Sequence, residues 1–187
     1  DNGKLKKLWL PSGIVIPYFV DDQLIRIKIR RPDPRTFLPK LKYYMVPGSS
    51  SSPMMLGPDK DAFAVIEAEL DGLLVFQYAG DNIGVCALGS SSNRPDVSGA
   101  GILSASLGIL DCLDYDGAGA KENKFWRENY QQTTRWPVPV GKDPGDAVEK
   151  GVDIRQWILA GLPARYHVKR RTIGQSRLIS ADAGGVA

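Results

Sequence analysis

The sequence predicts an α/β protein, in which a parallel four-stranded sheet carries helices on both faces and follows a small basic β-rich subdomain. Two observations support this prediction. From residue 62 onward, short apolar runs alternate with helical patterns, and these runs lack the apolar–polar alternation of strands that face water on one side. Before residue 58, the pattern is instead that of a hairpin, whose second strand carries closely spaced cations.

The basic subdomain is predicted around this hairpin. Two apolar runs flank Asp21 and Asp22, and in the second run three isoleucines alternate with three cations over 25–30. The basic face fits an ordinary solvated surface, but further cations follow it, and we interpret it as a ridge that contacts nucleic-acid phosphates. The candidate contacts are Arg26, Lys28, Arg30, Arg31, Lys40 and Lys42. A loop over 47–61, rich in Pro, Gly and Ser, is expected to be a linker.

The α/β domain is predicted to follow in strict succession of strand and helix. Its strands are expected over 62–69, 82–92, 107–116 and 135–140. Its helices are expected over 70–80, 97–107, 121–132 and 152–162. The last two helices carry aromatic and aliphatic residues at core-facing spacings. Succession of this kind is typical of a parallel sheet that is covered on both sides.

Charge is distributed unevenly along the 187 residues. Residues 1–57 hold 10 Lys and Arg against 4 Asp and Glu, residues 58–160 hold 9 against 16, and residues 161–187 hold 5 against 1. The balances of +6, −7 and +4 sum to the net charge of +3. Basic flanks suggest contact with a polyanion, and an acidic middle suggests bound cations. We therefore expect a subdomain over 1–57, an α/β domain over 58–162 and a basic tail over 163–187.

The cysteines and the hydropathy argue against disulfide-rich and membrane proteins. Cys86 and Cys112 each lie inside an apolar run without nearby His, so we interpret them as core side chains. No run of about 18 apolar residues and no signal-peptide segment is present, which predicts a cytoplasmic protein without membrane association. The chain begins without Met, which suggests a piece of a longer protein.

Acidic residues follow three of the predicted strands. They are Glu67 near the end of the first strand, Asp114 and Asp116 at the end of the third, and Asp143 with Asp146 after the fourth. Because the carboxyl ends of parallel strands meet at one edge, where ligands bind, we expect these side chains to converge. Two carboxylates about 4 Å apart repel by about 4 kcal/mol at a dielectric of about 20, so the cluster must bind protons or a cation. Oxygen ligands without Cys or His favour Mg²⁺ or Mn²⁺.

The region around Asp114 and Asp116 also allows other interpretations. The small residues 117–119 leave room for a phosphate to approach the backbone. However, an isolated acidic pair of this spacing equally fits the cap of a helix that starts near Ala120. Asp111 lies inside the third predicted strand, where an unpaired buried charge is costly. We expect Asp111 to be structural, paired with a nearby cation or placed in a partly exposed strand.

The motifs VIEAELDGL, LDYDGAGAK and KDPGDAV, in this order and at these distances, resemble a Toprim domain of the bacterial and phage DNA primase type. The resemblance covers residues 62–160. It extends upstream, where IVIPYF and LKYYMVPGSSSSPMMLG are similar to segments that precede the Toprim domain in primases. In one place the sequence departs from the family, because a primase usually has DPD where this chain has Asp143, Pro144, Gly145 and Asp146. Which of the two acids binds metal therefore stays open.

The resemblance implies a primase-like nucleotidyltransferase that makes primers on single-stranded DNA from nucleoside triphosphates with Mg²⁺ or Mn²⁺. The implied catalytic metal ligands are Glu67, Asp114 and Asp116, and the secondary ligands are Asp71, Asp143 and Asp146. The sequence contains no Cys/His zinc module, so template selection is expected from a helicase or zinc-binding module in trans or in a missing part of the chain. A Toprim nuclease and a non-catalytic nucleic-acid-binding module are the alternatives.

Overall fold

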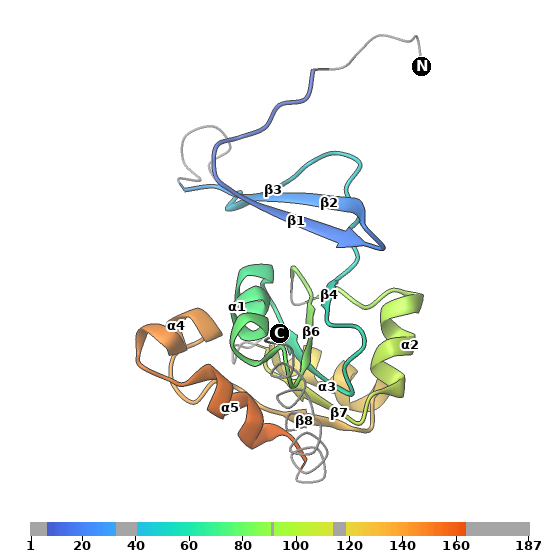
Figure 1. Ribbon diagram of the computed structural model, residues 1–187, viewed down its shortest axis with the longest axis vertical. Coiled ribbons are helices and arrows are strands. Elements are labelled where there is room, and N and C mark those ends of the chain that lie inside the picture. Colours follow the sequence, from blue (N-terminus) through green and yellow to red (C-terminus); the bar gives the residue numbers. More distant parts are fainter. Residues whose placement is uncertain (1–6, 33–40, 91, 114–118, 164–187) are drawn as a thin grey trace, which may run out of the picture. The chain divides into compact units, whose positions relative to one another are not determined.

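The computed structural model describes residues 7–32, 41–90, 92–113 and 119–163. The chain divides into two units, Asp1–Ser51 and Ser52–Ala187, and each unit contains one β-sheet (Figure 1). Nearly all of the predicted basic tail lies outside the described residues, and the predicted boundaries at 57 and 162 stay predictions. Within the described ranges, no helix combines the length and the apolar content needed to cross a lipid bilayer.

The first unit contains an antiparallel sheet. Its strands, in the order in which they pair, are β1 (Ile14–Val20), β2 (Gln23–Arg30) and β3 (Tyr43–Met45). Val20 pairs with Gln23, so the predicted hairpin has a two-residue loop, Asp21 and Asp22. These residues have φ of 47° and 60°, and this left-handed backbone matches the twist of a two-residue hairpin.

Two cations of β2 are less exposed than the sequence pattern predicts. Arg26 is 3% exposed and Lys28 is 8% exposed, so the expectation of an open basic face is wrong for these two residues. Aromatic rings on the neighbouring strands account for part of this difference. The Arg26 guanidinium lies 5.1 Å from the ring centre of Tyr18, and Lys28 Nζ lies 4.7 Å from that of Tyr43.

The second unit contains a five-stranded sheet of order β4-β6-β5-β7-β8. Its strands are β4 (Met54–Leu56), β5 (Ala62–Ile66), β6 (Gly84–Ala87), β7 (Gly108–Asp111) and β8 (Thr133–Arg135). The four strands from β5 to β8 are parallel, as predicted. The prediction of only four strands is wrong, because β4 pairs antiparallel with β6 at one edge. This strand lies in the segment that was expected to be a linker, and Met54 is buried there.

The last strand ends earlier than the sequence predicts. The prediction placed it over 135–140, whereas β8 ends at Arg135. Trp136 N–H donates to Asp111 O at 2.8 Å and makes the last such bond to β7. The chain then passes Pro137 and Pro139, which have no N–H with which to extend the pairing.

Helices cover both faces of this sheet. They are α1 (Glu69–Ala79), α2 (Val97–Ala105), α3 (Gly119–Asn129), α4 (Pro144–Glu149) and α5 (Ile154–Gly161). On one face α1 packs against β5, β6, α4 and α5. Gly72 allows this approach, because a Cβ there would lie 2.7 Å from the Ala87 Cβ. The sequence pattern does not predict α4, which begins inside the KDPGDAV motif.

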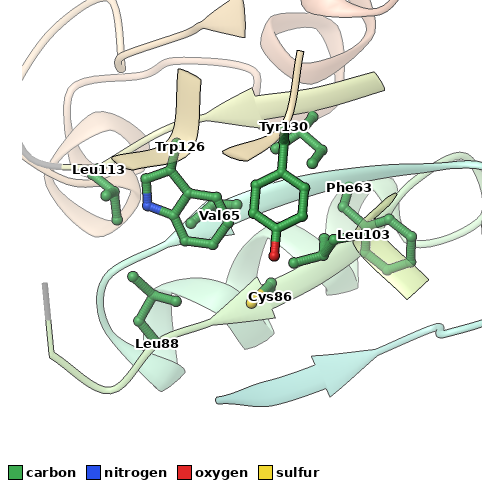
Figure 2. Close-up of a cluster of buried hydrophobic side chains, with 9 residues drawn as sticks. Phe63, Val65, Cys86, Leu88, Leu103, Leu113, Trp126 and Tyr130 are labelled. Atoms are coloured by element: carbon green, nitrogen blue, oxygen red, sulfur yellow. The ribbon is translucent and has the colours of Figure 1, made fainter. Parts of the chain in front are cut away.

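A cluster of buried hydrophobic side chains in the second unit lies on the other face, under α2 and α3 (Figure 2). Phe63 and Val65 of β5 point into it, and the rings of Trp126 and Tyr130 stack with centres 5.5 Å apart. Cys86 belongs to this cluster, and burial raises the pKa of its thiol to about 12. Cys86 and Cys112 are free and buried, which confirms that they are core side chains.

Candidate active site

Glu67 lies directly after β5, at the edge where the parallel strands end. Gly89 N–H donates to Glu67 O at 2.7 Å, and Leu88 N–H donates to Ile66 O at 2.9 Å. The chain that leaves β6 therefore runs beside Glu67. The glutamate is partly buried, and Gly89 has a φ of 80°, a left-handed backbone that favours glycine. The structure thus puts this predicted ligand at the edge of the sheet.

Asp71 joins the first turn of α1 to the beginning of α4. Its Oδ1 accepts a hydrogen bond from Gly145 N–H at 3.1 Å, between residues that are 74 positions apart. A Cβ at Gly145 would lie 3.1 Å from Asp71 Oδ1 and 3.3 Å from Asp143 Oδ1. The Oδ1 atoms of two predicted secondary ligands, Asp71 and Asp143, therefore both lie close to the position that a side chain at Gly145 would occupy.

Asp143 and Asp146 differ in their local roles. Asp143 is the N-cap of α4, where its Oδ1 accepts a hydrogen bond from Asp146 N–H at 2.8 Å. Pro144 at the first helical position fixes the backbone for this start. Asp146 lies in the first turn of the same helix and is partly buried. The Asp-Pro-Gly-Asp spacing that departs from the primase pattern is therefore the cap of a short helix.

The predicted acidic pair Asp114 and Asp116 lies outside the described residues, so its position relative to Glu67 stays a prediction. Among the residues whose placement is described, no three His, Cys, Asp or Glu side chains come together in a group that would hold a metal ion. The described part of the predicted set is Glu67, Asp71, Asp143 and Asp146. All four offer carboxylate oxygens, and such donors suit Mg²⁺ or Mn²⁺ chemically.

Asp111 forms a buried ion pair, as one of its two interpretations predicts, with a partner that the sequence does not identify. It is the last residue of β7, its side chain is fully buried, and Arg135 on β8 is its partner in the strand register. Arg135 Nη1 lies 3.1 Å from Asp111 Oδ1. Burial raises the pKa of Asp111, although the Arg135 charge and the Leu113 N–H both act to lower it. The expected cation partner exists, but only the pairing of β7 with β8 identifies it as Arg135.

Three of the predicted nucleic-acid contacts line one pocket of 540 Å³ in the first unit. The lining residues are Gly13, Ile14, Arg30, Arg31, Pro32 and Lys42. Arg31 N–H donates to Lys42 O at 3.0 Å, and Arg31 Nη1 donates to Leu41 O at 3.2 Å. These bonds hold the segment of Arg30 and Arg31 against the segment of Lys42. Three cations around one pocket suit an anion such as a phosphate. Lys40, also predicted to bind nucleic acid, lies outside the described residues.

Comparison of the sequence with protein-family models and with curated proteins finds no match. Comparison of the structure with solved structures does find matches. The RNA polymerase domain of Mycobacterium tuberculosis primase DnaG, in complex with a double-stranded DNA oligomer with a 6-nucleotide overhang, matches with a TM-score of 0.59 and 17% identity. The match covers 86% of this chain and 57% of that one.

Two further structures give similar values. The DnaG primase catalytic domain bound to ssDNA has a TM-score of 0.56 and 15% identity, and the match covers 86% of this chain and 55% of that one. The primase fragment of the bacteriophage T7 primase-helicase protein has a TM-score of 0.55 and 15% identity, over 78% of this chain and 61% of that one. This chain thus spans little more than half the length of these structures. Over most of its own length, it has the fold of DnaG-type and phage T7 primase catalytic cores.

Proposed function

We propose that this chain is a primase-like nucleotidyltransferase core, which makes primers on a single-stranded DNA template from nucleoside triphosphates. One observation carries the proposal: a fold like that of primase catalytic cores has Glu67 at the carboxyl edge of its parallel sheet. Glu67 occupies the place in the order of motifs that the primase-type Toprim pattern gives to its first metal ligand.

Carboxylates of this chain would hold the divalent ions. Glu67, Asp114 and Asp116 are proposed as the main ligands, with Asp71, Asp143 and Asp146 as secondary ones. When bound, Mg²⁺ or Mn²⁺ supplies charge neutralisation for the triphosphate and lowers the pKa of the attacking hydroxyl. Asp71 has a second task, because its hydrogen bond to Gly145 N–H fixes the start of α4 against α1. That bond sets the position of Asp143 and Asp146 relative to the first turn of α1.

The basic first unit would hold the template. Arg30, Arg31 and Lys42 line a pocket in which a backbone phosphate can accept hydrogen bonds from two guanidinium groups and an ammonium group. Such contacts fix the position of a strand without reading its sequence. The solved DnaG domains that this fold resembles include one bound to ssDNA, which supports the same class of ligand here.

The test is primer synthesis by the 187-residue chain. Single-stranded DNA is incubated with Mn²⁺ or Mg²⁺ and with ribonucleoside or deoxyribonucleoside triphosphates in separate reactions, and extension products are resolved by length. We expect products from the wild type. Glu67→Gln and Asp116→Asn should each lower the rate at least 100-fold, because each removes a negative oxygen ligand from the metal centre. Circular dichroism checks that both variants stay folded.

The matched controls make the same chemical changes at exposed positions. Glu149→Gln alters an exposed glutamate near the end of α4, and Asp59→Asn alters an aspartate whose side chain is 76% exposed. Both should retain wild-type rates. Cleavage of the template in place of extension, lost in Glu67→Gln, would overturn the proposal in favour of a Toprim nuclease. Salt-sensitive DNA binding without either reaction would favour a non-catalytic binding module.

A further inference from the structure

Arg135 makes an unusual set of contacts around the end of β7. Its Nη1 donates to the backbone oxygen of Asp111 at 2.9 Å and to Asp111 Oδ1 at 3.1 Å. Its Nη2 donates to the backbone oxygen of Leu113. One planar guanidinium therefore binds two carbonyl groups and one carboxylate, and the two carbonyls are two residues apart in the chain.

The Asp111 carboxylate completes this arrangement from inside the sheet. Besides Arg135, its Oδ1 accepts a hydrogen bond from Leu113 N–H at 3.2 Å. Leu113 is thus held at its N–H by Asp111 and at its carbonyl by Arg135. On the β5 side, Cys112 N–H donates to Val65 O at 3.0 Å. The three residues 111–113 are therefore fixed by hydrogen bonds although β7, as a strand, ends at Asp111.

Stability alone gives a weak reason for a charged pair at this place. Asp111 is fully buried in β7, whose other residues are all buried, and Arg135 is only 20% exposed. Two well-packed apolar side chains of similar size would avoid the desolvation of both charges and often give equal stability. An apolar pair cannot bind the Leu113 N–H and C=O. The charged pair therefore adds a fixed backbone direction beyond the end of β7.

We propose that Asp111 and Arg135 form a positioning pair, which sets the direction in which the chain leaves β7 toward Asp114 and Asp116. Leu113 is the residue directly before Asp114, so the bonds that fix its backbone fix the point from which the chain continues to the proposed ligands. Asp111 and Arg135 act through the backbone of 111–113, without contact to metal or substrate. The inference rests on the proposed metal centre. It adds to that centre two residues, Asp111 and Arg135, that are not among the predicted metal ligands.

The test compares Mn²⁺ affinity with stability in variants of the pair. Asp111→Leu combined with Arg135→Leu replaces both charges with apolar groups, and Asp111→Asn keeps the size of the side chain but removes its charge. Mn²⁺ alone is titrated into the full chain by calorimetry or by electron paramagnetic resonance. Amide exchange at Leu113 reports on the backbone directly. Urea unfolding without metal reports on stability.

We expect the double variant to unfold near the wild-type urea concentration, but to bind Mn²⁺ about 10- to 100-fold more weakly, as is typical when a group that orients a metal ligand is lost. Asp111→Asn should show a smaller loss of affinity in the same direction and faster exchange at Leu113. The control removes another Asp–Arg pair, the exposed Asp81 and Arg155. In this pair Arg155 Nη1 lies 2.7 Å from Asp81 Oδ1. Asp81→Asn with Arg155→Gln should leave the Mn²⁺ affinity unchanged.

Two outcomes separate this inference from the proposed function. Equal Mn²⁺ affinity in wild type and in folded Asp111→Asn overturns the positioning role, whatever the primer assay gives. Equal affinity in a folded double variant has the same consequence. A wild type that binds Mn²⁺ but makes no primer overturns the proposed function, whereas weaker Mn²⁺ binding in the pair variants still supports the positioning role.

Discussion

Asp111 shows at the scale of one residue why the candidate site was only partly predictable. The sequence marks it as a carboxylate in an apolar strand and so predicts a partner. The partner depends on which residue of β8 lies opposite, and β8 is a strand of three residues followed by prolines in alternate positions. Nothing in the local pattern around Arg135 distinguishes it from an exposed cation. The positions of Glu67 and Asp71, in contrast, follow from a motif at the end of a strongly apolar strand.

The raised pKa of Asp111 predicts the pH dependence of its contribution to stability. Because burial raises the native pKa above its ordinary value of 3.8, the native state keeps this proton over a pH window in which the unfolded state has lost it. The contribution of Asp111 to the free energy of unfolding therefore falls as pH rises through that window, by at most about 1.4 kcal/mol per pH unit. In Asp111→Asn the side chain does not ionise, so this decrease in the free energy of unfolding is absent.

Urea unfolding of wild type and of Asp111→Asn checks this expectation. It is measured at several pH values between about 4 and 7, a range that begins near the ordinary pKa of an aspartate and extends above it. The difference in unfolding free energy should shift in favour of Asn as pH rises. A shift in favour of Asp would mean that the Arg135 charge outweighs burial and lowers the native pKa. The exposed change Asp59→Asn should show no such trend.

At the scale of elements, strands with a strong apolar pattern were predicted well and short ones were not. The hairpin of β1 and β2 and the buried strands from β5 to β7 follow from runs of β-branched and apolar residues. β4 has three residues between Pro and Gly, a pattern typical of a loop. It is a strand only because it pairs with β6 at the edge of the sheet. α4 has six residues and begins with Asp-Pro-Gly, which favours a turn as much as a helix.

Gly13 gives a test of the pocket in the first unit. Its φ is +155°, and a Cβ there would lie 2.2 Å from Arg30 O, so Gly13→Ala must displace the backbone beside the pocket. We expect single-stranded DNA binding to weaken about tenfold, close to the value of one charge-assisted hydrogen bond. Fluorescence anisotropy with a labelled oligonucleotide measures this change.

Gly48→Ala is the matched control for Gly13→Ala. Gly48 also has a positive φ, +88°, but a Cβ there meets no atom within 4 Å. The control variant therefore carries backbone strain without a clash beside the pocket. Equal DNA affinity in both variants and in the wild type would contradict the assignment of the pocket to phosphate binding.

At the scale of the whole molecule, the uneven charge predicts strongly salt-dependent DNA binding. Each phosphate contact to a single strand contributes about 0.7 to the slope of log affinity against log salt. Lys42→Gln should lower that slope by about this amount, whereas Lys150→Gln, at an exposed lysine after α4, should leave it unchanged. An unchanged slope in Lys42→Gln would remove this lysine from the DNA interface.

The parallel part of the α/β fold was predictable because two kinds of information agree. The alternation of apolar runs and helical patterns indicates a covered parallel sheet, and the ordered acidic motifs indicate the primase type of Toprim domain. The structural match to DnaG-type and T7 primase cores agrees with both. The antiparallel β4 was missed because neither the periodicity nor the motifs include it.

Template-dependent primer synthesis by the 187-residue chain with Mn²⁺ or Mg²⁺ tests directly whether this protein is a primase-like nucleotidyltransferase. We expect extension products in the wild type, none without a divalent ion, and at least a 100-fold lower rate in Glu67→Gln than in Glu149→Gln. A wild-type chain that binds both Mn²⁺ and single-stranded DNA but makes no product would contradict the claim. So would a Glu67→Gln variant that extends primers at the wild-type rate.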